Sequence, residues 1–219
     1  MTEIATTGLR LYGFFNSSAS YRVRIALGLK GLAWEHVGVN IRVGEEDAPD
    51  YRARNPARLV PTLEHGERRL PQSLAIIDYL DHLCPEPRLI PAAGPERDRV
   101  LEIALLIACD IHPLNNLRVL KYLTADLGLS EAQKSAWYAH WIHEGFSALE
   151  ALLPDHDGWC VGDRPTLADC CLVPQVANAQ RMNVDLTPYP RIGRIHAYCQ
   201  RHPAFAQAAP NLQPDFIPA

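Results

Sequence analysis

The segment Leu59-Val60-Pro61-Thr62-Leu63 is a short apolar run interrupted by a proline. Proline cannot donate a hydrogen bond to a sheet, so Pro61 predicts a strand start, a sheet edge or a cis peptide bond. A cis bond would turn the Val60 amide and carbonyl outward, where an extended peptide-like ligand can pair with them. Further along, Gln72 and Ser73 open an apolar helical pattern, at a helix N-terminus whose free amides attract an anion. Together, these features predict a clamp for a small peptide that carries a carboxylate.

Strand-like and helix-like segments alternate around this clamp. Short apolar runs bounded by turn residues predict strands, and longer segments with helical apolar spacing predict helices. The resulting order, β-α-β-loop-β-β-α, is typical of an α/β domain. The predicted strands are Leu9–Phe15, Trp34–Val39, Leu59–Glu64 and Arg68–Leu70, and the predicted helices are Tyr21–Lys30 and Gln72–Leu83.

A proline-rich stretch, Cys84–Glu96, separates this region from one that contains only helical patterns. We therefore expect an α/β domain over 1–85, a linker over 86–96 and an all-helical domain over 97–219. Thr166 and Asp169 have the spacing of a capping box, which stabilises the start of a helix. The predicted helices of this domain are Asp98–Leu127, Ser130–Leu153, Thr166–Met182 and Pro190–Arg201.

The composition is that of a globular enzyme. Of the 219 residues, 47% are hydrophobic and 21% are charged, which is enough to bury a core in one large or two small domains. The net charge of −4 gives no basic footprint for nucleic acid. We expect no membrane span, because no apolar run has the necessary length. We also expect no secretion signal, because the first residues lack a basic start followed by an apolar stretch. A cytoplasmic location is therefore predicted.

The six cysteines include no C-x-x-C pair. Without a secretion signal they are predicted to be reduced thiols in buried structural positions. The histidines lack ligand spacing with cysteines or carboxylates, so no metal site is predicted. The cysteines are Cys84, Cys109, Cys160, Cys170, Cys171 and Cys199.

Serines follow the first predicted strand, in the segment Asn16-Ser17-Ser18-Ala19-Ser20. One of them is expected to cap the next helix, and a hydroxyl there can also donate to an anion such as a thiolate. Lowering a thiol pKa of ~8.5 by about two units needs roughly 2.7 kcal/mol. A hydroxyl and a helix N-terminus can supply that, since each contributes about 1–2 kcal/mol. A serine-protease nucleophile is not indicated, because no G-x-S-x-G motif surrounds Ser17 or Ser18.

The segment Asn16–Leu27 resembles the signature Ser-Ser-Cys-x-(Trp/His/Tyr)-Arg-Val-Arg-Ile-Ala-Leu of the zeta-class glutathione transferases, the maleylacetoacetate isomerase family. Similar stretches follow in order along nearly the whole chain. The resemblance implies a thioredoxin-like α/β N-terminal domain, an all-α C-terminal domain, a homodimer and glutathione as cofactor. The further stretches are Asn55-Pro56, Leu59–Leu63, Gln72–Ile76, Cys109–Asn116, Leu172–Arg181 and Val184–Pro190.

The same resemblance implies a role for each matching residue. Ser17, supported by Ser18, would stabilise the glutathione thiolate, and the Val60 backbone would pair with the cysteinyl unit. The γ-glutamyl carboxylate would lie at Gln72 and Ser73. His112 and Asn116 would face the active-site cleft, while Arg181, joined by Arg118, would hold substrate carboxylates. A structural role is expected for Arg22 and Arg24.

Three departures from the family pattern bear on function. Ala19 replaces the signature cysteine, Asn16 stands where an arginine is frequent, and Glu45-Glu46-Asp47 lies near the expected position of the glutathione glycine carboxylate. The first hypothesis is glutathione-dependent cis–trans isomerisation of maleylacetoacetate or maleylpyruvate, a small diketo-dicarboxylic acid, in aromatic catabolism such as tyrosine degradation. The second is a transferase or dehalogenase that consumes glutathione, which Asn16 favours slightly. The third is a non-catalytic interaction module, against which Ser17 and Ser18 argue.

Overall fold

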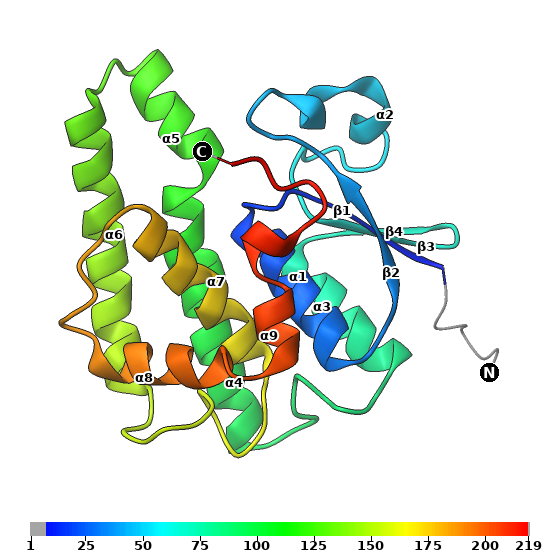
Figure 1. Ribbon diagram of the computed structural model, residues 1–219, viewed down its shortest axis with the longest axis vertical. Helices are drawn as coiled ribbons and strands as arrows, with labels where there is room; N and C mark the ends of the chain where they lie inside the picture. Colours follow the sequence, from blue (N-terminus) through cyan, green and yellow to red (C-terminus); the bar gives the residue numbers. More distant parts are fainter. Residues whose placement is uncertain (1–7, 219) are drawn as a thin grey trace. The chain divides into compact units, whose positions relative to one another are not determined.

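A computed structural model describes residues 8–218, which form two compact units (Figure 1). The first unit comprises the described residues up to Ile90 together with those from Gln200 onward, and the second is Pro91–Cys199. The expectation that the helical domain extends to residue 219 therefore differs from the structure. The residues from Gln200 onward pack with the α/β unit instead.

The first unit is built on a four-stranded mixed sheet of order β2-β1-β3-β4. β1 pairs in parallel with β2 and antiparallel with β3, and β3 pairs antiparallel with β4. The predicted α/β order is confirmed, with short helical turns that the sequence pattern did not indicate at η1, α2, α9 and η5. The elements are β1 (Leu9–Gly13), α1 (Ser18–Leu29), β2 (Trp34–Gly38), η1 (Glu45–Asp47), α2 (Pro49–Arg52), β3 (Thr62–His65), β4 (Arg68–Pro71), α3 (Ser73–Leu83), α9 (Pro203–Gln207) and η5 (Pro210–Leu212).

Pro61 determines where β3 begins. The strand starts at Thr62 and not at Leu59 as predicted, because a proline has no amide to donate to the ladder. The Val60–Pro61 peptide bond is cis, one of the three outcomes that the sequence left open.

The two faces of the sheet are used differently. On one face of the sheet, Leu9, Leu11 and Leu63 are at most 2% exposed. Helices α1 and α3 pack side by side (Figure 1). Since side chains alternate along a strand, Tyr12 turns to the other face. There Tyr12 packs with Val39 and with Tyr51 of α2.

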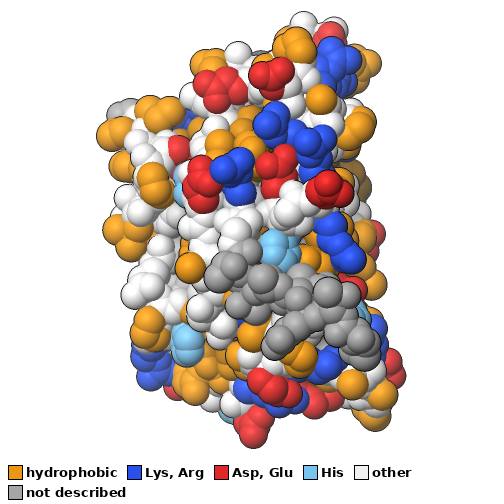
Figure 2. Space-filling view, turned by 90° about the vertical axis from the view of Figure 1, so that its right-hand side faces the viewer, with side chains coloured by type: hydrophobic (Ala, Val, Ile, Leu, Met, Phe, Trp, Pro, Cys, Tyr) orange, Lys and Arg blue, Asp and Glu red, His pale blue; other side chains and the backbone are white. Residues whose placement is uncertain are grey.

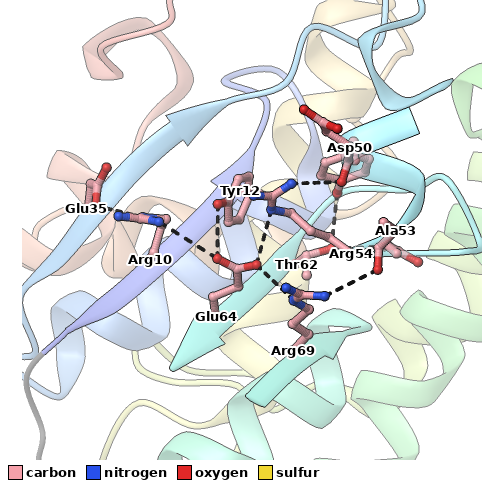
Figure 3. A network of polar contacts seen from close by, with 11 residues as sticks. Arg10, Tyr12, Glu35, Asp50, Ala53, Arg54, Thr62, Glu64 and Arg69 are labelled. Carbon is pink, nitrogen blue, oxygen red and sulfur yellow. Dashed lines mark hydrogen bonds and ion pairs between the residues drawn. The ribbon is translucent and has the colours of Figure 1, made fainter. Parts of the chain in front are cut away.

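A row of alternating charges crosses all four strands on the Tyr12 face (Figure 3). Arg10 is paired in register with Glu35 on one side and Glu64 on the other, and Glu64 is paired with Arg69. The Glu64 carboxylate accepts from Tyr12 Oη at 3.0 Å and lies 3.2 Å from Arg69 Nε. Opposite charges placed directly across strands stabilise this register. Figure 2 shows positive and negative side chains interspersed on the face that it draws, with no large area of one sign.

The C-terminal segment is attached to α1 and to the end of β1. A Cβ added at Gly28 would lie 3.1 Å from Ala204 Cβ, so the missing side chain permits the close packing of α9 on α1. Arg24 Nε donates to the Ala208 carbonyl at 3.1 Å, and the Phe15 amide donates to Asp215 at 2.8 Å. These contacts explain why the segment belongs to the first unit.

A buried ion pair joins α1 to α3. Lys30 Nζ lies 2.8 Å from Asp81 Oδ1, and the two side chains are 0% and 2% exposed. The ammonium also donates to the Cys84 and Pro87 carbonyls, at 2.7 and 2.9 Å. The Asp81 carboxylate accepts from the amides of Leu89 and Ile90 at 2.9 and 2.7 Å. This pair therefore fixes the chain that leaves α3.

The second unit is helical, as predicted. The expected helix Asp98–Leu127 is interrupted, because Pro113 has no amide for a helical hydrogen bond and the chain re-forms a helix at Asn116. A capping box starts α7, where the Thr166 amide donates to Asp169 at 2.8 Å. The elements are α4 (Pro95–Leu105), the π-helix η2 (Leu106–Ile111), η3 (His112–Asn115), α5 (Leu117–Lys121), the π-helix η4 (Tyr122–Asp126), α6 (Glu131–Leu152), α7 (Leu167–Arg181) and α8 (Pro190–Cys199).

Two further expectations, one on cysteine burial and one on membrane spans, need correction. Cys109 is exposed and Cys84 is only partly buried, whereas the other four cysteines are buried as predicted; none of the six forms a disulfide. Within residues 8–218, the helical run Pro95–Asp126 is long and apolar enough to cross a membrane by length and composition, contrary to the expectation from the sequence. One such helix is weak evidence for a membrane span, since a core helix passes the same test.

Candidate active site

Ser17 occupies the N-cap position of α1. Its hydroxyl oxygen accepts from the Ser20 amide at 3.2 Å, and its backbone is extended. This is the capping role expected for one of the serines. The capping bond uses an oxygen lone pair and leaves the hydroxyl hydrogen available for an anion. The first turn of α1 carries no acidic residue that would repel such an anion.

The other two hydroxyls of this loop differ from Ser17. Ser20 Oγ accepts from the Phe14 amide at 3.4 Å and so ties the end of β1 to α1. Ser18 is 5% exposed, and its hydroxyl oxygen has no hydrogen-bond partner within the described part of the chain. Ser18 therefore retains unused hydrogen-bonding capacity beside Ser17.

The backbone before Val60 is held by two side chains. Tyr51 Oη and Asn55 Nδ2 both donate to the Leu59 carbonyl, at 2.6 and 2.7 Å. Asn55 Nδ2 also lies 3.2 Å from Thr62 Oγ1, on the far side of Pro61. Burial raises the pKa of the Tyr51 phenol, which therefore remains a donor. Tyr51 and Asn55 therefore hold in place the backbone next to Val60, where pairing with a peptide is predicted.

Gln72 and Ser73 begin α3, as the sequence predicted. Gln72 is the N-cap residue, with φ of 73°, a left-handed conformation that costs a residue other than glycine about 1–3 kcal/mol. Ser73 is the first helical residue, and its hydroxyl oxygen accepts from Arg22 Nη1 at 3.3 Å. No acidic residue lies in the first turn of α3. The free amides and hydroxyl of this turn suit a carboxylate.

Three of the predicted site residues lie in one short segment of the second unit. His112 begins η3, directly after the π-helix η2, and π-helical turns are frequent at functional sites. Asn116 is the N-cap of α5, and its side-chain oxygen accepts from the Val119 amide at 3.2 Å. Arg118 is exposed in the first turn of the same helix. The observed contact of Asn116 is thus that of a helix cap.

Arg181 is the last residue of α7 and is exposed. Burial raises the pKa of Tyr138 to about 12, while the charge of Arg181 acts in the opposite direction, which places the two side chains within electrostatic reach. Tyr138 Oη is buried and has no hydrogen-bond partner within residues 8–218. The Tyr138 carbonyl accepts from Asn115 Nδ2 at 3.1 Å. Tyr138 and Asn115 were not singled out from the sequence, where a tyrosine in a helix and an asparagine before a cap carry no distinguishing signal.

Arg42 is a second residue that the sequence did not indicate. Its guanidinium lies over the rings of Phe14 and Phe15, 5.5 and 5.1 Å from their centres, beside the serine loop. Two of the acidic residues noted nearby have local partners. Glu45 Oε2 accepts from the Asn40 amide at 2.6 Å, and Asp47 pairs with Arg58 at 2.9 Å. The segment 40–47 therefore carries both positive and negative side chains.

Comparison with known proteins identifies the family. The model of the glutathione S-transferase N-terminal domain matches residues 11–88, and that of the C-terminal domain matches residues 131–207. The chain belongs to the glutathione S-transferase family. Over 94% of its length it is 52% identical to a probable maleylacetoacetate isomerase of Vibrio cholerae, 98% of which is covered.

Two solved structures agree with this assignment. A maleylpyruvate isomerase in its holo form, described as a bacterial zeta-class glutathione transferase, has a TM-score of 0.92 and 47% identity, with 95% of this chain and 100% of the other covered. A maleylacetoacetate isomerase of Methylobacterium extorquens AM1 with bound malonate and glutathione has a TM-score of 0.90 and 36% identity, with 96% of this chain and 100% of the other covered. The predicted resemblance to the zeta class and the predicted fold are confirmed.

Proposed function

We propose that this protein is a glutathione-dependent cis–trans isomerase that converts maleylacetoacetate to fumarylacetoacetate. The observation that carries this proposal is the pair of helix N-termini in the first unit, one capped by Ser17 and one opened by Gln72 and Ser73. The thiolate and the γ-glutamyl carboxylate of a cysteine-containing γ-glutamyl peptide are anions, and such helix N-termini stabilise anions. The 52% identity to a probable maleylacetoacetate isomerase supports the choice of this reaction.

The residues of the first unit fit glutathione. Gln72 and Ser73 would hold the γ-glutamyl carboxylate, and the Val60 backbone would pair with the cysteinyl unit. The unpartnered hydroxyl oxygen of Ser18 and the free hydroxyl hydrogen of Ser17 supply polar groups for the thiol end. When bound, glutathione supplies a thiolate that adds reversibly to the cis double bond, so that the bond can rotate before the thiolate leaves.

The chain's own residues then perform three tasks. The Ser17 hydroxyl donates to the sulfur and, with the N-terminus of α1, favours the thiolate. Arg181, joined by Arg118, would hold the carboxylates of the substrate and stabilise the negative charge that forms on its carbonyl oxygen. His112 and Asn116 are proposed to face the active-site cleft and to contact the bound glutathione. No residue of the chain forms a covalent bond in this scheme.

Maleylpyruvate is the second candidate substrate, because the solved structure with a TM-score of 0.92 is a maleylpyruvate isomerase. Both acids have a cis double bond next to a carbonyl group, so the same residues would serve. Incubation with each acid and a catalytic amount of glutathione, followed by ultraviolet absorbance, identifies the preferred substrate. Conversion of neither acid would favour the transferase or dehalogenase that Asn16 suggested.

We further propose a cytoplasmic homodimer that acts in aromatic catabolism, such as the degradation of tyrosine. A homodimer would cover apolar side chains on the helical run Pro95–Asp126. Only 33% of the most apolar stretch of this run is buried within the chain. Leu105 and Tyr122 on this run are 44% and 55% exposed. Sedimentation of the purified chain measures its oligomeric state directly.

Replacing Gln72 or Ser73 by alanine is expected to weaken glutathione binding by roughly 1–3 kcal/mol each, because a charged carboxylate loses a hydrogen-bond partner. Gln72→Ala leaves the left-handed strain in place, so its effect reports the lost side chain. Calorimetric titration of each variant measures the dissociation constant. Unchanged values for both variants would disprove the proposed clamp.

Replacing Arg181 by alanine is expected to raise KM for the diacid if Arg181 binds ground and transition states equally, and to lower kcat if it stabilises the developing negative charge. Arg181→Lys should recover only part of the loss, because an ammonium cannot bind a carboxylate bidentately. Steady-state kinetics with saturating glutathione separate the two effects. Wild-type kinetics in Arg181→Ala would remove Arg181 from the site.

A further inference from the structure

Helix α1 carries two buried arginines whose surroundings differ. Arg24, 0% exposed, donates from Nε to the Ala208 carbonyl at 3.1 Å, from Nη1 to the Phe14 carbonyl at 3.4 Å and from Nη2 to the Phe15 carbonyl at 3.0 Å. Each nitrogen of its guanidinium thus has an acceptor from the backbone. These contacts are consistent with the structural role expected for Arg24.

Arg22 is equally buried but lacks this support. It is 2% exposed, and only Nη1 has a partner, the Ser73 hydroxyl at 3.3 Å. Across residues 8–218, neither Nε nor Nη2 finds an acceptor, and no carboxylate forms an ion pair with Arg22. The unpartnered hydroxyl of Ser18 lies on the same face of the helix, one turn earlier. A buried charge without a counter-ion costs several kcal/mol, which calls for a ligand or a function that offsets it.

The contact between Arg22 and Ser73 also fixes the direction of the Ser73 hydroxyl. A guanidinium has donors only, so the Ser73 oxygen must accept in this bond. Its single hydrogen therefore points elsewhere, and it meets no acceptor in the part of the chain that the structure describes. Ser73 is held as a donor at the first residue of α3, next to the left-handed N-cap residue Gln72.

We propose that Arg22 is a positioning residue that sets the charge specificity of this end of the site. It orients the Ser73 hydroxyl as a donor, and its guanidinium provides the buried positive charge that a ligand carboxylate neutralises. The inference rests on the proposed function, in which this ligand is the γ-glutamyl end of glutathione. It goes further, because it assigns the preference for a carboxylate over a neutral group to Arg22. Arg22 acts through the Ser73 hydroxyl, which binds the carboxylate.

The test compares glutathione with its analogue in which the γ-glutamyl carboxylate is a neutral carboxamide. Calorimetry should show that the wild type prefers glutathione and that Arg22→Met weakens glutathione binding by about tenfold or more, equivalent to ~1.4 kcal/mol. The variant should bind the carboxamide with nearly unchanged affinity, so that the preference collapses. Arg22→Lys retains the charge and should recover part of it. In the double variant Arg22→Met/Ser73→Ala, the losses should be less than additive, because both act on one contact.

Arg24→Lys is the matched control, since it alters a buried arginine of the same helix that bonds only to carbonyls. It should lower the melting temperature and leave the ratio of the two dissociation constants unchanged. If Arg22→Met lowers the melting temperature but keeps the full wild-type preference, Arg22 is structural and the proposal is wrong.

A measurement on the wild type decides the matter even if Arg22→Met does not fold. With ¹⁵N-labelled arginine, the Nε resonance of Arg22 should shift on addition of glutathione and not on addition of the carboxamide. No shift with glutathione, although glutathione binds, would overturn the proposal. Failure of the proposed function has a different signature, because the wild type would then bind no glutathione or would leave both diketo acids unchanged.

Discussion

Ser17→Ala is expected to lower turnover by one to three decades. The hydroxyl that caps α1 has one hydrogen free for the glutathione sulfur, and loss of such an anion donor removes roughly 1.4–4 kcal/mol of stabilisation. Glutathione affinity should change little, because in the proposed function the peptide is held mainly through Val60, Gln72 and Ser73. Turnover at saturating glutathione, together with the pH dependence of thiolate absorbance in the complex, measures the effect.

The capping role of Ser17 requires a control. Alanine also removes the hydrogen bond from the Ser20 amide. This loss is expected to lower the free energy of unfolding by about 0.5–2 kcal/mol. Ser17→Thr keeps both the cap and the hydroxyl and should retain most of the turnover, while Ser18→Ala should have a milder effect than Ser17→Ala. Full activity in a folded Ser17→Ala protein would show that the sulfur is stabilised elsewhere.

Removing one partner of the buried ion pair is expected to be the most destabilising of the substitutions considered. Asp81→Asn or Lys30→Met leaves a charge that is 0–2% exposed without its partner, at a cost of about 3–5 kcal/mol. Denaturant titration of each variant gives the free energy of unfolding. The double variant should lose less than the sum of the two, because each single variant already breaks the pair.

The exposed pair of Arg58 and Asp47 provides a matched control in the same unit. Its atoms are 2.9 Å apart, but its side chains are 53% and 55% exposed, so Asp47→Asn should cost less than about 1 kcal/mol. Equal losses for Asp81→Asn and Asp47→Asn would contradict the role given to burial.

The sequence predicted the parts of the site that depend on local pattern. The start of α3 at Gln72 and Ser73, a cap of α1 by one of the serines and the interruption of the sheet ladder at Pro61 each follow from residues adjacent in the chain. The structure adds the left-handed backbone of Gln72, which has no sequence signal, because glutamine is not a residue that favours positive φ.

Contacts between distant residues were beyond the sequence patterns. The bond from Arg22 to Ser73 and the return of α9 to Gly28 join segments far apart in the chain. The apolar spacing of the predicted helix Asp98–Leu127 outweighed the proline signal at Pro113, and for this reason the break between η2 and α5 was missed. The register of Arg10 against Glu64 required the strand pairing itself.

The consumption of glutathione tests the central claim most directly. With glutathione far below the concentration of the cis-diketo acid, an isomerase converts all of the acid, because the thiolate that adds to the double bond is released again. The expected result is complete conversion, the same thiol titre before and after the reaction, and no thioether adduct in the mass spectrum. Loss of one thiol for each molecule converted, or no conversion of either maleylacetoacetate or maleylpyruvate, would contradict the isomerase assignment and leave a transferase.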